Sequence, residues 1–196
     1  MTDKDPARVS LRLRALIDDF QACISSLEQC GRPVIGVVHG HAIGLALDIL
    51  SAVDVRYAAK DATFSIREAA IGLAADIGSL QRLPKVVGND SLARELAFTA
   101  RDFSADEALR LGLVSRVEND REAALRAAVE TAKVITQRSP IAVTGTKTAL
   151  VYSRDHSVPE GLHYMQLLNG ALLQTEDLGA SITAVMQKQP PRFSKL

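Results

Sequence analysis

The sequence predicts an α/β protein in which short strands alternate with helices. Three runs, at 34–38, 54–58 and 62–66, have the β-branched content or the alternation that is typical of strands. A long helical pattern precedes the first run, and a second helix stands between the first two runs. Strand, helix and strand in so short a stretch indicate an α/β core. After Gly78 the pattern becomes mostly helical.

The opening element is predicted to be an amphipathic helix over 8–29, which Gly31-Arg32-Pro33 ends. The continuous apolar run at 34–38 is typical of a strand that is covered on both faces. We expect His39-Gly40-His41 to turn the chain into a helix that begins near Ile43. The apolar face of the opening helix consists of Val9, Leu13, Leu16, Ile17, Phe20, Ile24 and Leu27.

Helix start signals dominate the second half of the chain. Ser104 and Glu107 have the spacing of a capping box, and Ser139-Pro140 places a cap before a first-turn proline. The stretch 159–188 predicts one or two terminal helices. The only further strand candidate is 113–117.

Composition excludes some classes of partner. At 196 residues and 47% hydrophobic content the chain is able to bury one sizeable core. Its 23 basic and 23 acidic residues leave no net charge to attract nucleic acid or an anionic membrane, although local basic patches stay possible. Charge therefore says little about partners, and we expect no nucleic acid. No apolar stretch reaches the roughly 20 residues of a membrane span, and no signal sequence opens the chain. We therefore expect a soluble protein.

Three carboxylates stand in or between apolar runs. Asp48 lies within the apolar run 43–50, Asp76 lies within 71–78, and Glu68 stands between the two runs. Burying a carboxylate costs several kcal/mol unless it is paired or protonated, and burial moves its pKa toward the range that is useful for proton transfer. The three acids therefore predict one acid/base site.

On a helix that begins near Ile43, Asp48 shares a face with Gly44 and Leu45. The amides of Gly44 and Leu45 belong to the first turn, where N–H groups lack intrahelical partners and the helix dipole favours negative charge. One turn thus offers an anion donor and a carboxylate. This pairing suits a reaction in which a carbonyl oxygen gains charge while a neighbouring carbon loses a proton.

Seven motifs are spread along the chain, namely His39-Gly40-His41-Ala42-Ile43-Gly44, Asp54-Val55-Arg56-Tyr57, Phe64 through Gly72, Gln81-Arg82-Leu83-Pro84, Thr99-Ala100-Arg101, Ala105-Asp106-Glu107-Ala108 and Gly112-Leu113-Val114. Together they resemble the crotonase (enoyl-CoA hydratase/isomerase) superfamily, and the match covers nearly the whole chain. The acids at positions 48, 68 and 76, the last of them inside Gly-Leu-Ala-Ala-Asp, make the chain similar to the Δ3,5-Δ2,4-dienoyl-CoA isomerases of that family.

The resemblance implies an enzyme that converts a 3,5-dienoyl-CoA into a 2,4-dienoyl-CoA in fatty-acid β-oxidation. Glu68 would remove a proton from C2, Asp76 would protonate C6, and Asp48 would sit beside Glu68 and tune its ionisation. Which of Glu68 and Asp76 acts first stays open. The amide of Leu45, where the family has glycine, would be an oxyanion donor beside Gly44. No cofactor is implied, because coenzyme A is part of the acyl-CoA substrate.

The resemblance also implies an architecture. We expect a crotonase-like ββα spiral core at 1–117, a carboxy-terminal helical region at 118–190 that forms trimers paired into hexamers, and a tail at 191–196. The family's opening strands and its Ala-Gly-x-Asp segment, which supplies the other oxyanion donor, are missing from this chain. We therefore expect an amino-terminally shortened isomerase.

The chain ends in Ser194, Lys195 and Leu196, a sequence that an import receptor reads as a peroxisomal address. We therefore expect the peroxisome, with the mitochondrion as a further location for a full-length form.

Two other functions stay open. An enoyl-CoA hydratase would need a water-activating pair at Asp48 and Glu68 and would leave Asp76 idle. Alternatively, a catalytically impaired shortened form would act only by co-assembly with full-length subunits.

Structural roles are alternatives for the same acids. Asp48 is then a charge paired with Arg56, Glu68 is a surface residue, and Asp76 caps the helix through Leu83. The motif His39-Gly40-His41 offers two imidazoles but no third ligand at a familiar spacing, so we expect no metal.

Overall fold

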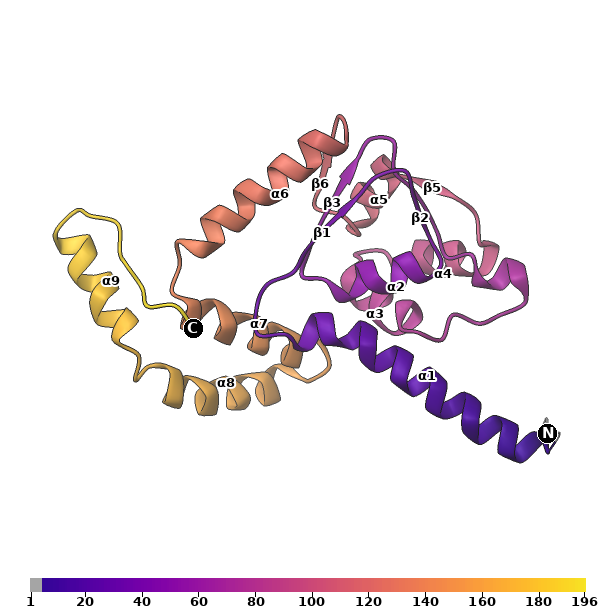
Figure 1. Cartoon of the computed structure of the whole chain (residues 1–196), viewed down its shortest axis with the longest axis horizontal. Coiled ribbons are helices and arrows are strands. Elements are labelled where there is room, and N and C mark those ends of the chain that lie inside the picture. Colours follow the sequence, from indigo (N-terminus) through magenta and orange to yellow (C-terminus); the bar gives the residue numbers. More distant parts are fainter. Residues whose placement is uncertain (1–4) are drawn as a thin grey trace. The chain divides into compact units, whose positions relative to one another are not determined.

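A computed structural model describes residues 5–196, and the chain divides into two compact units (Figure 1). The first unit comprises the residues up to Gln29 together with Val34–Leu125, and the second comprises Cys30–Pro33 together with Arg126–Leu196. The boundary falls inside helix α6 (Arg121–Thr136). The predicted division into a catalytic core at 1–117, an oligomerisation region at 118–190 and a targeting tail at 191–196 stays a prediction.

The first unit begins with α1 (Pro6–Gln29), which confirms the predicted opening helix and has a proline at its first position. Only Ile24 of its apolar face is buried, whereas Leu16 is 64% exposed. A helix of 24 residues is about 36 Å long. Near its carboxyl end, Ile24 is buried and Leu27 packs against the core of the first unit.

One three-stranded sheet is wholly parallel and has the order β1-β3-β6, so that β1 is an edge strand. Its strands are β1 (Ile35–Val38), β3 (Val55–Ala59) and β6 (Arg116–Glu118). The strands predicted at 34–38 and 54–58 are confirmed. The last strand lies further along than the predicted 113–117, because Leu113 and Val114 are buried in the core instead.

The second sheet has the order β2-β4-β5, with β2 parallel to β4 and β5 antiparallel to it. Its strands are β2 (His41–Ile43), β4 (Thr63–Ser65) and β5 (Phe103–Ser104). The strand predicted at 62–66 is confirmed. The turn predicted at 39–41 was partly wrong, because His41 already pairs with Thr63.

Helices complete the first unit and surround a core that includes the fully buried Phe64, Leu47 and Leu83. Phe64 stacks on Phe103 with ring centroids 5.3 Å apart, which joins β4 to β5. The helices are α2 (Leu45–Ala52), the short 3₁₀ helix η1 (Glu68–Ile71), α3 (Ser79–Val86), α4 (Asp90–Thr99) and α5 (Ala105–Leu111).

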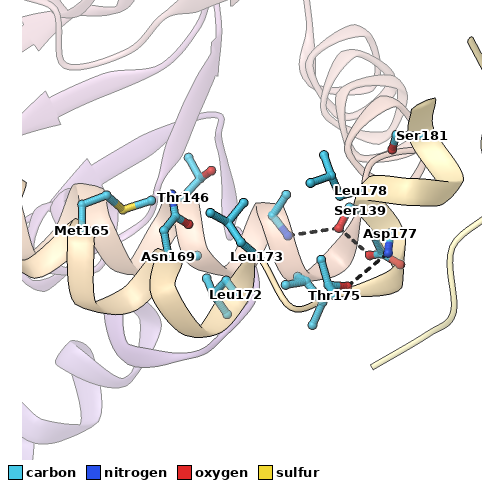
Figure 2. Close-up of a pocket in the computed structure, with 13 residues that line it drawn as sticks. Ser139, Thr146, Met165, Asn169, Leu172, Leu173, Thr175, Asp177, Leu178 and Ser181 are labelled. Carbon is cyan, nitrogen blue, oxygen red and sulfur yellow. Dashed lines mark hydrogen bonds between the residues drawn. The ribbon is translucent and has the colours of Figure 1, made fainter.

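The second unit is helical, as predicted. Besides most of α6 it contains α7 (Pro140–Arg154), α8 (Val158–Leu172) and α9 (Glu176–Met186). Ser139 caps α7, which confirms the predicted cap. A cavity of about 310 Å³ lies among these three helices, and the predicted acid/base residues take no part in it (Figure 2). Nowhere in 5–196 is a helix long and apolar enough to cross a bilayer.

Candidate active site

Asp48 lies in the first turn of α2 and is 2% exposed. Its Oδ1 accepts a hydrogen bond of 2.6 Å from the backbone N–H of Ser79, the first residue of α3. Gly78, at the N-cap of α3, has no side chain that could cap the helix. Asp48 therefore satisfies, from a distant position in the sequence, one of the first-turn N–H groups that lack intrahelical partners.

Burial raises the pKa of Asp48 above its ordinary value. Hydrogen bonding from Ser79 and the positive charge of Arg82 oppose this shift, and the negative charge of Asp76 adds to it. Asp76 thus lies close enough to Asp48 for its charge to act on that carboxyl. The resemblance placed Asp48 beside Glu68, but Glu68 is not among the groups that shift the pKa of Asp48.

Glu68 begins η1 and is half-buried, so the reading as an ordinary surface residue was wrong. Its Oε2 is buried and has no hydrogen-bond partner among residues 5–196. Most buried polar atoms in folded proteins are paired, so an unpaired carboxylate oxygen indicates a functional group. A Cβ added to Gly44 would lie 3.1 Å from Glu68 Oε1, which places this carboxylate against the start of α2.

The two amides at the start of α2 differ. Gly44 donates its N–H to Ser65 O at 2.9 Å, so the expectation that it is a free anion donor was wrong. Gly44 has a φ of 57° and leaves room for the Glu68 carboxylate. The N–H of Leu45 donates to no acceptor in the described part of the chain. The role of the Leu45 amide as an oxyanion donor stays a prediction.

Ser65 and Arg67 hold the segment that leads to Glu68, a role that no pattern in the sequence predicts. Ser65 is fully buried, and its hydroxyl donates to Ala100 O at 3.0 Å. Arg67 Nε donates to Ser65 Oγ at 3.1 Å, and its guanidinium pairs with Asp102. These bonds fix the backbone on which Glu68 stands.

Asp76 lies in the segment between η1 and α3, which has no regular secondary structure, and it is half-buried. Its backbone carbonyl accepts a 2.5 Å hydrogen bond from Gln21 Nε2 of α1. The alternative that Asp76 caps α3 was wrong, because the N-cap is Gly78 and the capping bond comes from Asp48. The side chain of Asp76 is not used for capping.

The alternative pair of Asp48 with Arg56 was also wrong. Arg56 donates from Nε to Leu113 O at 2.6 Å and from Nη1 to Val53 O at 2.6 Å. Burial lowers the pKa of Arg56, and the nearby Asp54 opposes that shift. The guanidinium of Arg56 thus binds two backbone carbonyls and not a carboxylate of the candidate site.

Residues 5–196 contain no group of three or more His, Cys, Asp or Glu side chains arranged to hold a metal ion. His39 and His41 lie at the exposed junction of β1 and β2.

The sequence model described as "Enoyl-CoA hydratase/isomerase" matches residues 14–195. The chain belongs to the enoyl-CoA hydratase/isomerase family. Among solved structures, this family member resembles the enoyl-CoA hydratase from Bacillus anthracis, with a TM-score of 0.87 and 28% identity over 93% of this chain and 70% of that one. An enoyl-CoA hydratase/isomerase from Cupriavidus metallidurans has a TM-score of 0.85 and 35% identity over 96% of this chain and 69% of that one. The crotonase fold is thereby confirmed.

Within the family, the chain is similar to proteins that are named dienoyl-CoA isomerases. The mitochondrial Delta(3,5)-Delta(2,4)-dienoyl-CoA isomerase of Mus musculus is 51% identical over 98% of this chain and 60% of its own length. The peroxisomal protein of that name from Arabidopsis thaliana is 46% identical over 98% of this chain and 69% of its own length. The chain spans about 60% of the length of the first of these relatives.

Proposed function

We propose that the chain isomerises a 3,5-dienoyl-CoA to the 2,4-dienoyl-CoA. Glu68 takes a proton from C2 of the acyl-CoA thioester, and the electron pair spreads through the diene onto the thioester oxygen. The amide of Leu45 binds that oxygen. Asp76 then delivers a proton to C6, so that the double bonds shift to C2–C3 and C4–C5 with no net gain or loss of atoms in the substrate. Exchange with solvent removes the proton that Glu68 gained and replaces the one that Asp76 gave up.

The observation that carries this proposal is the buried, unpaired Oε2 of Glu68 beside the unused amide of Leu45. A proton acceptor needs a free lone pair, and a developing oxyanion needs a free donor. Exposed apolar side chains on the same segments suit the hydrocarbon part of an acyl chain. They are Ile43, Leu45, Ile71 and Leu73, with exposed fractions between 38% and 74%.

Asp76 is the second acid of the mechanism because it is half-buried, near Asp48, and unused in capping. The names of the mouse and Arabidopsis relatives support the same reaction. No cofactor is needed, because the proton moves between carboxylates and substrate carbon.

The test is the ultraviolet absorbance of a 3,5-dienoyl-CoA incubated with the purified chain, in which growth of the 2,4-dienoyl band reports isomerisation. Asp76→Asn should abolish this growth while thioester binding is retained. Asp61→Asn, which neutralises an exposed acid in the turn between β3 and β4, is the matched control. An active Asp76→Asn variant would remove Asp76 from the mechanism.

The hydratase alternative is tested on the same samples with a 2-enoyl-CoA. Hydration would remove the conjugated band, would require Glu68, and would persist in Asp76→Asn. Such a result, without isomerisation of the dienoyl substrate, would favour the hydratase.

One observation favours the alternative that the chain acts only by co-assembly. Strand β1 lies at the edge of its sheet, and a groove of about 250 Å³ runs along β1 and α2. An open edge presents unpaired N–H and C=O groups to another chain. A folded sample that is silent alone, but changes the activity of a full-length relative on mixing, would support this alternative.

Trimers paired into hexamers, built through the helices of the second unit, are part of the proposal. These helices expose a set of large apolar side chains that a subunit interface would cover. The molar mass in solution, measured by light scattering, tests this point. The set includes Leu150, Val158, Leu162, Leu167, Ile182 and Val185.

The proposed location is the peroxisome, reached through an import receptor that binds Ser194, Lys195 and Leu196. All three residues are exposed and lie beyond the last helix, as receptor binding requires. The Arabidopsis relative is named peroxisomal and the mouse relative mitochondrial, so a mitochondrial form is compatible with the family. A chain that ends at Lys195 and still enters peroxisomes would refute this address.

A further inference from the structure

The last turns of α1 carry a polar face that contacts the segment on which Asp76 stands. This polar face of α1 consists of Gln21, Ser25 and Glu28, which recur at helical spacing and so project from one side of the helix. The same helix lies against α2 in the first unit (Figure 1).

Gln21 binds the Asp76 segment directly. Its Nε2 donates to Asp76 O at 2.5 Å, across 55 positions of sequence. The residues on either side of Asp76 are in neither helix nor strand, so no regular hydrogen-bond ladder orients this peptide group. The Gln21 bond therefore carries much of that task.

Ser25 and Glu28 act through Arg82 of α3. Arg82 Nη2 donates to Ser25 Oγ at 2.8 Å, and Arg82 Nε lies 2.9 Å from Glu28 Oε2. The side chains of Arg82 and Glu28 are each 10% exposed, so the ion pair is largely shielded from water. Arg82 Nη1 in turn donates to Ile77 O at 3.4 Å.

Two successive carbonyls, those of Asp76 and Ile77, are therefore bound by side chains that belong to α1 or that α1 holds. Fixing both peptide groups fixes the direction in which the Asp76 side chain leaves the backbone. Proton transfer is sensitive to such placement, since an error of about 1 Å costs on the order of 10²-fold in rate.

We infer that Gln21, with Ser25, Glu28 and Arg82, forms a positioning device for the acid that delivers the proton to C6. This inference rests on the proposed function, because it assigns that step to Asp76. The inference predicts different effects on the two proton transfers. The positioning device contacts the Asp76 segment, whereas the segment of Glu68 is held by Ser65 and Arg67 on other elements. Loss of the device should damage the second transfer and spare the first.

The experiment measures both transfers with a 3,5-dienoyl-CoA in deuterium oxide. Deuterium entering C2 of recovered substrate reports proton removal by Glu68, and growth of the 2,4-dienoyl band reports delivery at C6. In Gln21→Met, isomerisation kcat should fall about ten- to hundredfold, with little change in KM, while the rate of C2 exchange stays within about twofold of wild type. Gln29→Met, an exposed glutamine on the same helix, should change neither.

Each contrary outcome has a distinct meaning. Equal losses of exchange and isomerisation in Gln21→Met, or no loss of either, would overturn the positioning role. Glu28→Gln provides a second variant that should show the same split through Arg82, should Gln21→Met fold poorly by circular dichroism. A wild-type chain that neither exchanges nor isomerises would refute the proposed function itself, and the positioning role with it.

Discussion

The bond between Asp48 and the start of α3 makes a prediction that two substitutions can separate. Asp48→Asn retains an oxygen that can accept the Ser79 N–H and removes the buried charge, whereas Asp48→Ala removes both. A buried amide that loses its acceptor costs about 1–3 kcal/mol. For a chain of this size each kcal/mol is about 2–4 °C in Tm. The Ala variant should therefore melt roughly 2–12 °C below the Asn variant.

The same residue predicts a dependence of stability on pH. Because burial raises the pKa of Asp48, the folded chain holds the proton of this group more tightly than the unfolded chain does. The stability of the wild type therefore falls as pH rises from below the ordinary value of 3.8 through the raised pKa. Asp48→Asn lacks this titration, so its stability relative to wild type should increase across the same window and then stay constant.

Urea unfolding followed by circular dichroism, repeated at a series of pH values, measures both effects. Hydrogen exchange at the Ser79 amide localises the first effect, because this amide should lose protection in Asp48→Ala and keep it in Asp48→Asn. Equal protection in the two variants would refute the capping role. A wild type that gains stability relative to Asp48→Asn as pH rises would refute the assigned cause of the pKa shift.

Two further predictions concern glycines against which another side chain packs so closely that a Cβ would clash with it. Gly145→Ala should destabilise the α7–α8 pair by about 1–3 kcal/mol, because its Cβ would lie 2.4 Å from Leu172 Cδ1. Thermal unfolding measures this effect. The control is Gly170→Ala, whose Cβ meets nothing within 4 Å. Gly78→Ala should cost more than Gly145→Ala in the same assay, because Gly78 has a φ of 136° and the new Cβ would lie 1.8 Å from Arg82 Nη1. An unfolding curve of Gly78→Ala that matches wild type would contradict this reading.

Elements with a strong local pattern could be predicted from the sequence. The helix at 6–29 and the strands at 35–38 and 55–59 follow from periodicity and β-branched content. The start of α7 follows from Ser139, which stands directly before a proline. Strand β2 was missed because its three residues lie within a turn-like motif. A strand that short has too few positions for alternation to show.

For the candidate site, the sequence indicated which acids to consider but not the groups that bind them. Asp48, Glu68 and Asp76 stood out because acids interrupt apolar runs, but their partners come from distant positions. Ser79 lies 31 positions from Asp48, and Gln21 lies 55 from Asp76. Capping preference is a local rule, so it offered Asp76, which lies just before α3, as the cap of that helix. A local rule takes no account of Asp48, which folding brings to the amide of Ser79.

The polar bonds around α3 are better explained by orientation than by stability. Burying the charges of Arg82, Glu28 and Asp48 costs free energy that their mutual attraction repays only in good geometry, and apolar residues of similar size often stabilise a protein as well or better. These groups instead orient the backbone. Asp48 binds the amide at the start of α3, Arg82 binds a carbonyl just before it, and Glu28 holds Arg82 in place. Glu68 presents the opposite case, with a buried oxygen left unpaired. In the proposed mechanism this difference matters, because the acid that takes a proton needs a free lone pair and the acid that gives one needs a fixed position.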